Sequence, residues 1–350
     1  MCAIKFAVVD ESAKLRSYDI KENKNSYSPL NCEVGEGSTF AVDFKNNTEL
    51  FRALATGCTI NNRSRVDFEE GEFKRIGEPT EAALKVFAEK LMSKPTTQAN
   101  AFDFEKKARS TIKEIATLDF TSERKAMSTI VSGYKNNKYL LIKGAPDRIL
   151  SKCTMFESLG NPTGAKTFNE SQKSKILAQV NELSAQGLRC LAIAECPLSG
   201  LLADLNDSNK TKLLGNPQKF DVYESGATFL GIICIKDPVR PEVKPAIQAC
   251  KTAGIRVIMI TGDSKETALS IAKELNIIEK HQNPADCVFT GSEFNAMTND
   301  ERLKAVGGEA GKVFSRVEPQ HKRELVKALI ELGHVVAMTG DGVNDAPALK

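Results

Sequence analysis

The second half of the chain alternates apolar runs with polar, glycine-containing loops, and this alternation constrains the fold more than any other feature. Residues 255–260 (Ile-Arg-Val-Ile-Met-Ile) run into Thr-Gly-Asp at 261–263, and residues 335–338 (Val-Val-Ala-Met) run into Thr-Gly-Asp-Gly-Val-Asn-Asp at 339–345. Apolar runs of this length are typical of buried parallel strands. Residues 264–276 have the pattern of a helix, and strands that alternate with helices predict βαβ units in an α/β fold.

Two carboxylates follow the second apolar run. Asp341 and Asp345 come directly after the strand predicted over 335–338. The carboxyl ends of parallel strands are where open α/β sheets bind ligands, and carboxylate oxygens suit Mg²⁺, which usually binds beside substrate phosphates. The alternative is a Gly-Asp-Asn loop that serves only as a turn.

The first apolar run ends in a candidate phosphate site. Thr261 supplies a hydroxyl, Gly262 an unobstructed backbone and Asp263 a carboxylate, directly before a predicted helix. A helix N-terminus of this kind favours anions. Lys322 lies in another predicted helix, which reaches to about residue 332, and would place a cation at the same edge of the sheet. The alternatives are a capped helix and a solvated lysine.

These segments, in this order, resemble the phosphorylation domain of P-type ATPases, a doubly wound member of the haloacid dehalogenase-like fold. Residues 314–322 (Phe-Ser-Arg-Val-Glu-Pro-Gln-His-Lys) are most similar to those of the sarco/endoplasmic reticulum calcium pumps. Residues 143–146 (Lys-Gly-Ala-Pro) resemble the nucleotide-domain signature of that family, and residues 237–240 (Asp-Pro-Val-Arg) resemble its hinge, with Val where Pro is usual. The resemblance covers essentially the whole chain.

The resemblance implies a catalytic role for several residues of this second half. Thr261 would hold a phosphoryl oxygen, Asp263 would help to position Mg²⁺-ATP, Lys322 would neutralise charge, Asp341 would ligate Mg²⁺, and Asp345 would orient the metal shell. Phosphoryl transfer depends mostly on positioning and charge neutralisation.

The phosphorylated aspartate of the family is absent from this sequence. No Asp-Lys-Thr-Gly-Thr string occurs, and in the family that string lies just before the position of Met1. We therefore expect the large cytoplasmic loop of a pump, without its nucleophile strand and without turnover on its own. Asp10 follows an apolar run at residues 3–9, but Glu-Ser-Ala comes next instead of a second Asp or Lys-Thr-Gly. The resemblance places that run at the start of the nucleotide domain.

No Gly-x-x-x-x-Gly-Lys-Ser/Thr loop occurs, so any ATP site is not of the P-loop kind. Phe120 ends a predicted strand, where it is either a core residue or an aromatic surface that can stack a base. The resemblance implies that Phe120 stacks adenine, that Lys125 and Met127 contribute to the same pocket, and that Lys143 forms its floor.

Two further residues enter the nucleotide site through the resemblance alone. Glu81 would accept a hydrogen bond from the adenine amine, although by itself it is an ordinary first-turn carboxylate that suits the helix dipole. Arg189 would reach an ATP phosphate. Ser122 stands where calcium pumps often have an arginine, and Arg124 or Lys125 could partly replace that charge.

Composition excludes several classes of protein. The net charge of +3 is too small to indicate nucleic-acid binding, and 41% hydrophobic with 27% charged residues is typical of globular proteins. No run approaches the roughly 18 apolar residues of a membrane span, and the amino terminus does not resemble a signal peptide. The nine cysteines form no Cys-x-x-Cys pair, which favours reduced cytosolic thiols over zinc ligands.

We expect two domains. Residues 1–236 would form a nucleotide-binding domain of mixed antiparallel sheet with helices, and residues 237–350 a partial phosphorylation domain. In the first, we expect helices at 48–58, 79–92, 102–116 and 169–185, strands at 118–120, 127–131, 139–142 and 190–194 with a hairpin over 133–138, and loops at 20–48 and 204–218.

The sequence thus predicts the ATP-binding region of a cation pump, most similar to those for calcium, acting through an aspartyl-phosphate. ATP and Mg²⁺ are the expected cofactors, and the actuator domain, membrane domain and nucleophile segment the expected partners, at the cytoplasmic face of a membrane such as the endoplasmic reticulum. The alternatives are a pump for another cation, a nucleotide-binding module without turnover, and a soluble phosphatase of the same superfamily, for which no nucleophile Asp is found.

Overall fold

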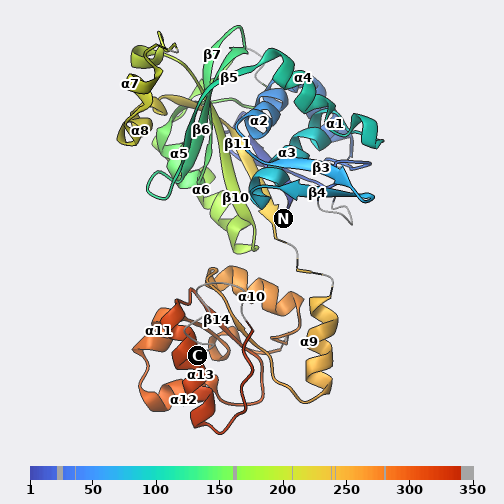
Figure 1. Cartoon of the computed structure of the whole chain (residues 1–350), viewed down its shortest axis with the longest axis vertical. Helices are drawn as coiled ribbons and strands as arrows, with labels where there is room; N and C mark the ends of the chain where they lie inside the picture. Colours follow the sequence, from blue (N-terminus) through green and yellow to red (C-terminus); the bar gives the residue numbers. More distant parts are fainter. Residues whose placement is uncertain are drawn as a thin grey trace. The chain divides into compact units, whose positions relative to one another are not determined.

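The structure, a computed structural model, describes residues 1–21, 27–35, 37–160, 164–206, 208–237, 239–240, 242–279 and 281–339. The chain divides into two compact units (Figure 1). The larger consists of Met1–Leu183 and Leu188–Asp237, and the smaller includes Pro238–Lys350.

A mixed, mostly antiparallel sheet forms the centre of the larger unit. Its main path runs β2-β1-β11-β10-β7-β6-β5, with β8 pairing in parallel with β11 and β9 pairing with β8. The strands are β1 (Cys2–Val9), β2 (Leu15–Asp19), β5 (Lys113–Thr121), β6 (Ala126–Tyr134), β7 (Asn137–Gly144), β8 (Cys153–Phe156), β9 (Lys166–Thr167), β10 (Arg189–Pro197) and β11 (Ala227–Lys236). This sheet and its helices confirm the α/β architecture predicted for this part of the chain.

Helices cover both faces of this sheet. Along each strand successive side chains point to opposite faces. The helices of the larger unit are α1 (Gly37–Asn46), α2 (Thr48–Ile60), α3 (Pro79–Met92), α4 (Asp103–Thr111), α5 (Pro146–Lys152), α6 (Glu170–Ala185), α7 (Lys210–Leu214) and α8 (Phe220–Tyr223). On one face, Phe6 and Ile233 pack with Phe51 and Phe87 of α2 and α3. On the other, residues such as Ile142 pack with α5 and α6.

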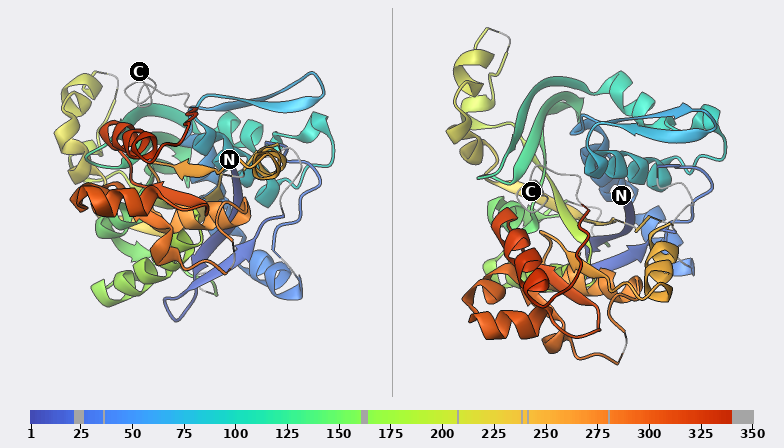
Figure 2. Two further views of the ribbon diagram at one scale, coloured as in Figure 1. Left: turned by 90° about the horizontal axis from the view of Figure 1, so that it is seen from below. Right: turned by 60° about the horizontal axis from the view of Figure 1, so that its bottom comes forward.

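Two smaller elements complete the larger unit. The β3 (Arg65–Glu69) and β4 (Glu72–Ile76) strands form a hairpin that projects beside α3 (Figure 2). Short 3-10 turns occur at Gln98–Asn100, Gly200–Leu202 and Pro217–Lys219. The helix at 79–92 and the β6–β7 hairpin were both predicted from the sequence and are confirmed.

Three local predictions for this unit were wrong in extent. The helix predicted to reach residue 116 ends at Thr111, because Lys113–Thr121 pairs with β6 as β5. The segment 20–48, predicted as a loop, contains helix α1, whose Phe40 packs in the aromatic cluster around Phe6. The segment 204–218 contains α7. In each case tertiary packing outweighs local composition.

The smaller unit contains a parallel sheet, as the alternation of strands and helices predicted. Its described strands are ordered β12-β14-β13 and pair in parallel. The elements are α9 (Val243–Thr252), β12 (Ile258–Ile260), α10 (Lys265–Glu274), β13 (Val288–Thr290), α11 (Gly291–Ala296), α12 (Asn299–Val306), β14 (Lys312–Ser315) and α13 (Pro319–Glu331), with a 3-10 turn at Pro284–Asp286. On β14, Val313 packs toward α10 and Phe314 toward α13.

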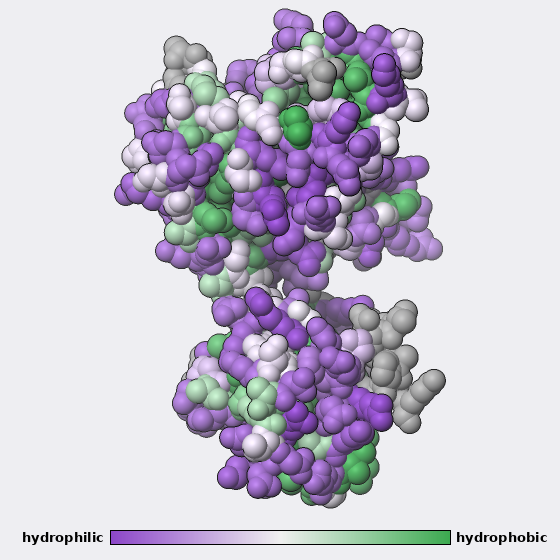
Figure 3. Space-filling model, turned by 90° about the vertical axis from the view of Figure 1, so that its left-hand side faces the viewer, coloured by the Kyte–Doolittle hydropathy of each residue, from purple (hydrophilic) through white to green (hydrophobic). Residues whose placement is uncertain are grey.

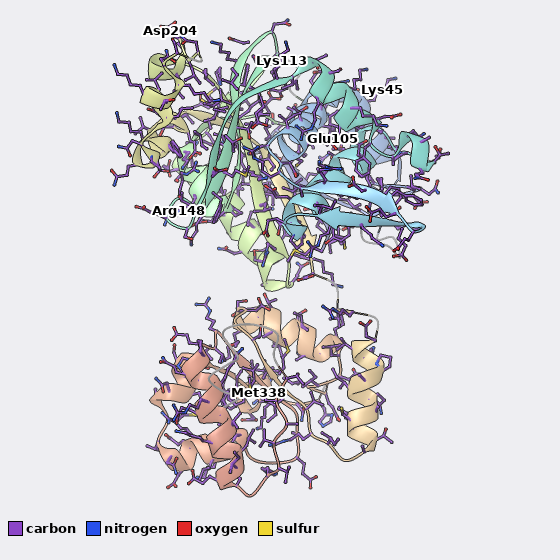
Figure 4. All side chains as sticks on the ribbon, viewed as in Figure 1. Lys45, Glu105, Lys113, Arg148, Asp204 and Met338 are labelled. Carbon is purple, nitrogen blue, oxygen red and sulfur yellow. The ribbon has the colours of Figure 1, made fainter. Side chains whose placement is uncertain are left out.

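The buried strand predicted over 335–338 is not formed. Val335 is fully exposed, Val336 and Met338 are half-buried, and none of them pairs with a described strand. Met338 is marked in Figure 4. An extended segment becomes a strand only when a neighbour supplies hydrogen-bond partners. Among the described residues, no ladder of this kind joins the segment to β12, β13 or β14, although Val336 packs in the same apolar cluster as Ile258 and Ile260 of β12.

The surface is largely polar. On the face drawn in Figure 3, hydrophilic side chains cover most of both units, and apolar patches are small. No helix in the described part of the chain combines the length and the apolar character that crossing a bilayer requires. All nine cysteines are free thiols, and all but Cys250 are buried.

Candidate nucleotide-binding site

A bulge at the end of β5 presents Phe120 to solvent. Leu118 pairs with Ser128 and Thr121 pairs with Ala126, and the register shifts between these two pairs, at Asp119 and Phe120. A bulge re-aims side chains locally and is common near functional sites. The ring of Phe120 is 59% exposed, which is unusual for a large aromatic side chain and excludes the core role.

A buried ion pair lies on the same face of the sheet. Lys143 on β7 donates through Nζ to Glu81 on α3 and to the backbone carbonyl of Asn61. The exposed fractions of the two charged side chains are only 8% and 12%. The backbone N–H of Arg63 donates to the second carboxylate oxygen of Glu81 at 2.8 Å. The two residues that the resemblance assigned to separate roles around one ligand therefore contact each other directly.

Burial lowers the pKa of Lys143, and the Glu81 carboxylate offsets part of this effect. A buried lysine is disfavoured in its charged form unless a partner compensates for the lost hydration. Met127 is the cross-strand neighbour of Lys143 and is buried beside it. The floor of the site therefore combines Lys143, whose charge is compensated by Glu81, with the apolar side chain of Met127.

Arg189 begins β10 on the same face of the sheet. It lies four residues before Ile193, which pairs with Lys143, and the period of two along a strand gives these three side chains one orientation. The guanidinium is exposed and donates to the hydroxyl of Thr80 at 3.3 Å. Thr80 directly precedes Glu81 in helix α3, so Arg189 is tethered close to the ion pair.

The turn between β5 and β6 holds Lys125 in a left-handed conformation. Its φ is +50°, and its N–H donates to the carbonyl of Thr121 at 2.8 Å. Its own carbonyl accepts from Ala145 at 3.0 Å. A Cβ at Gly144 would lie 2.4 Å from that carbonyl oxygen, so only glycine allows this approach. The side chain of Lys125 is exposed and offers a cation near Phe120.

Arg124 does not supply the positive charge that calcium pumps often have at the position of Ser122. Its side chain is buried, and its guanidinium forms an ion pair with Glu224. The guanidinium also lies 5.2 Å from the centre of the Phe220 ring. The expectation that Arg124 contributes charge to a phosphate is therefore wrong, whereas the same expectation for Lys125 stays a prediction.

In the smaller unit, the loop at 261–263 closes on itself. The Thr261 hydroxyl donates to the Asp263 carboxylate at 3.0 Å and accepts from the Asp263 N–H at 3.1 Å. Backbone bonds join this loop to the one after β14, from Arg316 to Asp263 and from Val317 to Thr261. The loop thus lies at the carboxyl end of β12, as expected for a phosphate site, and a Cβ added at Gly262 would meet no atom within 4 Å.

Lys322 lies in the first turns of α13, which begins two residues after Val317. It is half-buried, and the helix starts at the same edge of the sheet as the 261–263 loop. Asp341 and Asp345 lie outside the described residues. No group of three or more His, Cys, Asp or Glu side chains within the described ranges is arranged to hold a metal ion.

Sequence reasoning missed Asn61, the residue that organises the floor of the site. This fully buried amide donates to the carbonyls of Met127 and Leu141 and accepts from the Thr129 hydroxyl at 2.9 Å. Its carbonyl accepts from Lys143. The only sequence signal was an Asn pair directly after an apolar helix, a pattern that usually indicates a helix end.

Asp10 has a structural role. Its carboxylate accepts hydrogen bonds from Ser12 and from the backbone of Lys14 in the turn after β1. Burial opposes ionisation, but these hydrogen bonds outweigh it and lower the pKa of Asp10. The carboxylate is thus used in a turn of the antiparallel sheet and not at the edge of a parallel one.

Comparison with known proteins adds independent information. A family model described as the P-type ATPase cytoplasmic domain N matches residues 50–242. The calcium-transporting ATPase 2, endoplasmic reticulum-type, of Arabidopsis thaliana is 38% identical over 316 residues, covering 85% of this chain and 30% of that protein. The calcium-transporting ATPase 4, endoplasmic reticulum-type, of the same plant is 35% identical over 345 residues, covering 96% of this chain and 31% of that protein.

A fungal protein is similar to the same extent. The endoplasmic reticulum calcium ATPase srcA of Aspergillus fumigatus is 38% identical over 343 residues, covering 90% of this chain and 34% of that protein. The chain therefore spans about a third of the length of the curated relatives it matches.

Proposed function

Because this chain belongs to the P-type ATPase family, we propose that it is the nucleotide-binding and partial phosphorylation region of a calcium-transporting pump. The larger unit binds ATP, and the smaller unit contributes to phosphoryl transfer. Three relatives named as endoplasmic reticulum calcium ATPases support the calcium assignment and the location at that membrane.

One observation carries the nucleotide proposal. Phe120, Met127, Lys143 and Arg189 come from four strands of one sheet, and with Glu81 of α3 they lie on one face. The exposed ring of Phe120 supplies a stacking surface, which is worth about 1–3 kcal/mol per base. Arg189 and Lys125 supply exposed cations for phosphate groups.

The Glu81–Lys143 pair fits a site that opens for its ligand. Glu81 is the acceptor for the adenine amine in this proposal, and Lys143 closes the floor beneath the ring. Because each charge satisfies the other in the structure, no uncompensated charge remains on this pair before the nucleotide arrives.

In the smaller unit, Thr261, Gly262, Asp263 and Lys322 are proposed to serve the transferred phosphoryl group and Mg²⁺-ATP. The chemistry of these residues fits: a hydroxyl and a backbone N–H suit phosphoryl oxygen, and the exposed carboxylate of Asp263 suits a hard cation. Asp341 and Asp345 are proposed as metal ligand and orienting residue. Mg²⁺ would supply charge neutralisation when bound.

A titration tests the nucleotide site. We expect the Phe120→Ala variant to bind a fluorescent ATP analogue about tenfold more weakly, since it loses the stacking surface. Lys125→Ala should weaken ATP more than adenosine. The matched controls are Phe68→Ala, an exposed phenylalanine on β3, and Lys113→Ala, at the other end of β5 (Figure 4). Unchanged affinity in both Phe120→Ala and Lys125→Ala would overturn the assignment.

The calcium assignment needs the longer protein. ATP hydrolysis by the membrane-bound pump should depend on Ca²⁺ in roughly the micromolar range, that of cytosolic calcium sensors. Hydrolysis stimulated by another cation and indifferent to Ca²⁺ would favour a different transported ion.

A further inference from the structure

We propose that the buried Arg124–Glu224 pair is the positioning element that holds Phe120 in its exposed orientation, and that it thereby sets nucleotide affinity without touching the nucleotide. This inference rests on the function proposed above, because it concerns the same stacking residue.

Arg124 forms hydrogen bonds directly to the backbone of the bulge. Its Nη2 donates to the carbonyl of Leu118 at 3.2 Å and to the carbonyl of Asp119, the two residues immediately before Phe120. Bulged residues lose regular ladder partners, so their carbonyls need other donors. The planar fork of a guanidinium supplies several donors in fixed geometry, which an ammonium does not. Arg124 therefore determines the backbone path that leads into Phe120.

Glu224 fixes the guanidinium in turn. It lies just after α8 and is completely buried. Its carboxylate accepts from Arg124 and Ser128 through one oxygen and from Lys152 through the other. A fully buried carboxylate with three donors has a single favourable orientation, because loss of any donor leaves a charge that is costly to bury.

The pair lies on the other side of the sheet from the stacking surface. Ser128 lies between Ala126 and Ile130 on β6, and both neighbours belong to the core that contains Phe220. By alternation, Met127 faces the opposite side. Phe120 does so as well, because the bulge shifts the register: the next residue, Thr121, pairs with Ala126, which belongs to the same core as Leu118. Glu224 thus lies away from the nucleotide face, and Arg124 connects it to the bulge.

A cavity beside the Arg124–Glu224 pair should allow the protein to fold when one of these two residues is substituted. It has a volume of about 220 Å³ and is lined in part by Arg124, Lys152 and Asp221. Each of these three groups already has an ion-pair partner, so the cavity itself indicates no ligand. Its polar lining can admit water, which can satisfy donors released by a substitution at Glu224.

The experiment uses the full chain with Phe120→Trp. The sequence contains no tryptophan, so the indole introduced at position 120 is a unique fluorescent reporter of the bulge. In this background we compare Arg124→Lys and Glu224→Gln with a matched control, Glu195→Gln. Glu195 is also a buried carboxylate that accepts from a lysine, but it lies near Tyr134, at the opposite end of β6 from Phe120. The measurements are the fluorescence anisotropy of the reporter indole, ATP affinity and melting temperature.

We expect Arg124→Lys to keep the positive charge but to lose the hydrogen bonds to the carbonyls of Leu118 and Asp119. Its melting temperature should fall by only a few degrees, because two carbonyls lose their donor. The anisotropy of the reporter indole should fall, and the Kd for ATP should rise about tenfold, the effect of one strong hydrogen bond. Glu224→Gln should show the same signature with a larger loss of stability. Glu195→Gln should lose stability without changing either the anisotropy or ATP affinity.

The failures are distinguishable. If Arg124→Lys leaves anisotropy and ATP affinity at parent values, the pair is only structural and the inference is overturned. If Glu224→Gln does not fold, Ser128→Ala decides, because it removes a single donor and must still raise the Kd about twofold or more. If Phe120→Ala does not weaken ATP binding, the proposed function fails instead, whatever the Arg124 variants show.

Discussion

The Lys143–Glu81 pair allows a quantitative test of how the candidate site is stabilised. Replacing Lys143 by Met removes the ammonium and leaves Glu81 nearly buried without its counter-charge. Breaking a buried pair in this way typically costs about 3–5 kcal/mol. Glu81 keeps the Arg63 N–H at 2.8 Å and a side-chain exposure of 12%, so we expect the lower end, about 3 kcal/mol.

The reverse substitution should cost less. Glu81→Gln keeps an oxygen acceptor for Lys143, and the carbonyl of Asn61 also remains. Because burial already lowers the pKa of Lys143, the amine can lose its proton when its partner is neutral. We expect a cost of about 2 kcal/mol. The double variant removes both charges and should cost no more than Lys143→Met alone, which gives a coupling energy of about 2 kcal/mol.

The assay is thermal unfolding of the parent protein, the two single variants and the double variant at about pH 7. Hydrogen exchange at residues 139–142 assigns the transition to the larger unit. A change of about 1 kcal/mol should shift the midpoint by about 2–4 °C in a unit of this size. The reasoning would be refuted if the two single effects simply add within about 0.5 kcal/mol, as they do for sites that do not interact. Nucleotide affinity should remain weak in the double variant, even though it is no less stable than Lys143→Met.

Two further predictions concern the larger unit. Burial raises the pKa of Glu89 from its ordinary 4.5 to about 7, although N–H groups of Phe104 and Glu105 donate to it. The folded state then holds this proton more tightly than the unfolded chain, so the contribution is complete below about pH 4.5 and is lost as pH rises through about 7, by at most about 3 kcal/mol. Urea unfolding should give a lower free energy of unfolding at about pH 8 than at about pH 5, and Glu89→Gln should remove this difference. The same pH dependence of the free energy of unfolding in both proteins would contradict the assignment. Gly144→Ala would place a Cβ 2.4 Å from the carbonyl oxygen of Lys125, so it should destabilise the unit by about 1–3 kcal/mol and weaken ATP binding; a neutral effect on melting temperature would show that the turn can relax.

Local features of this fold were predictable because local physics decides them. The helix at 79–92 combines a proline in its first turn with apolar residues at helical spacing, and its bounds agree with the prediction. The apolar run before Thr261 forms β12, and its side-chain-capped successor α10 begins directly after Ser264. The parallel pairing of β12 with β14 also follows from strands that alternate with helices.

For the candidate site, the sequence predicted which residues belong to it but not which of them contact one another. The motif at 143–146 and the segment around Phe120 indicated which residues to consider, and the exposure of Phe120 agrees with a surface role. Nothing in the local sequence indicates that Lys143 contacts Glu81, because the two residues are 62 positions apart. The role of Asn61 was missed for the same reason.

The amino-acid pattern alone therefore predicts the periodicity, the order of the elements and the family to which the motifs belong. Which charges are buried and which are exposed to a ligand depends on tertiary contacts. Arg124 and Lys125 are adjacent in sequence, yet one is sequestered by Glu224, 100 residues away, and the other is exposed. The segment 335–338 has the composition of a strand and remains unpaired in the described structure. The physical reason is common to both: burial and pairing depend on what the folded chain places alongside a residue, and its local sequence does not contain that information.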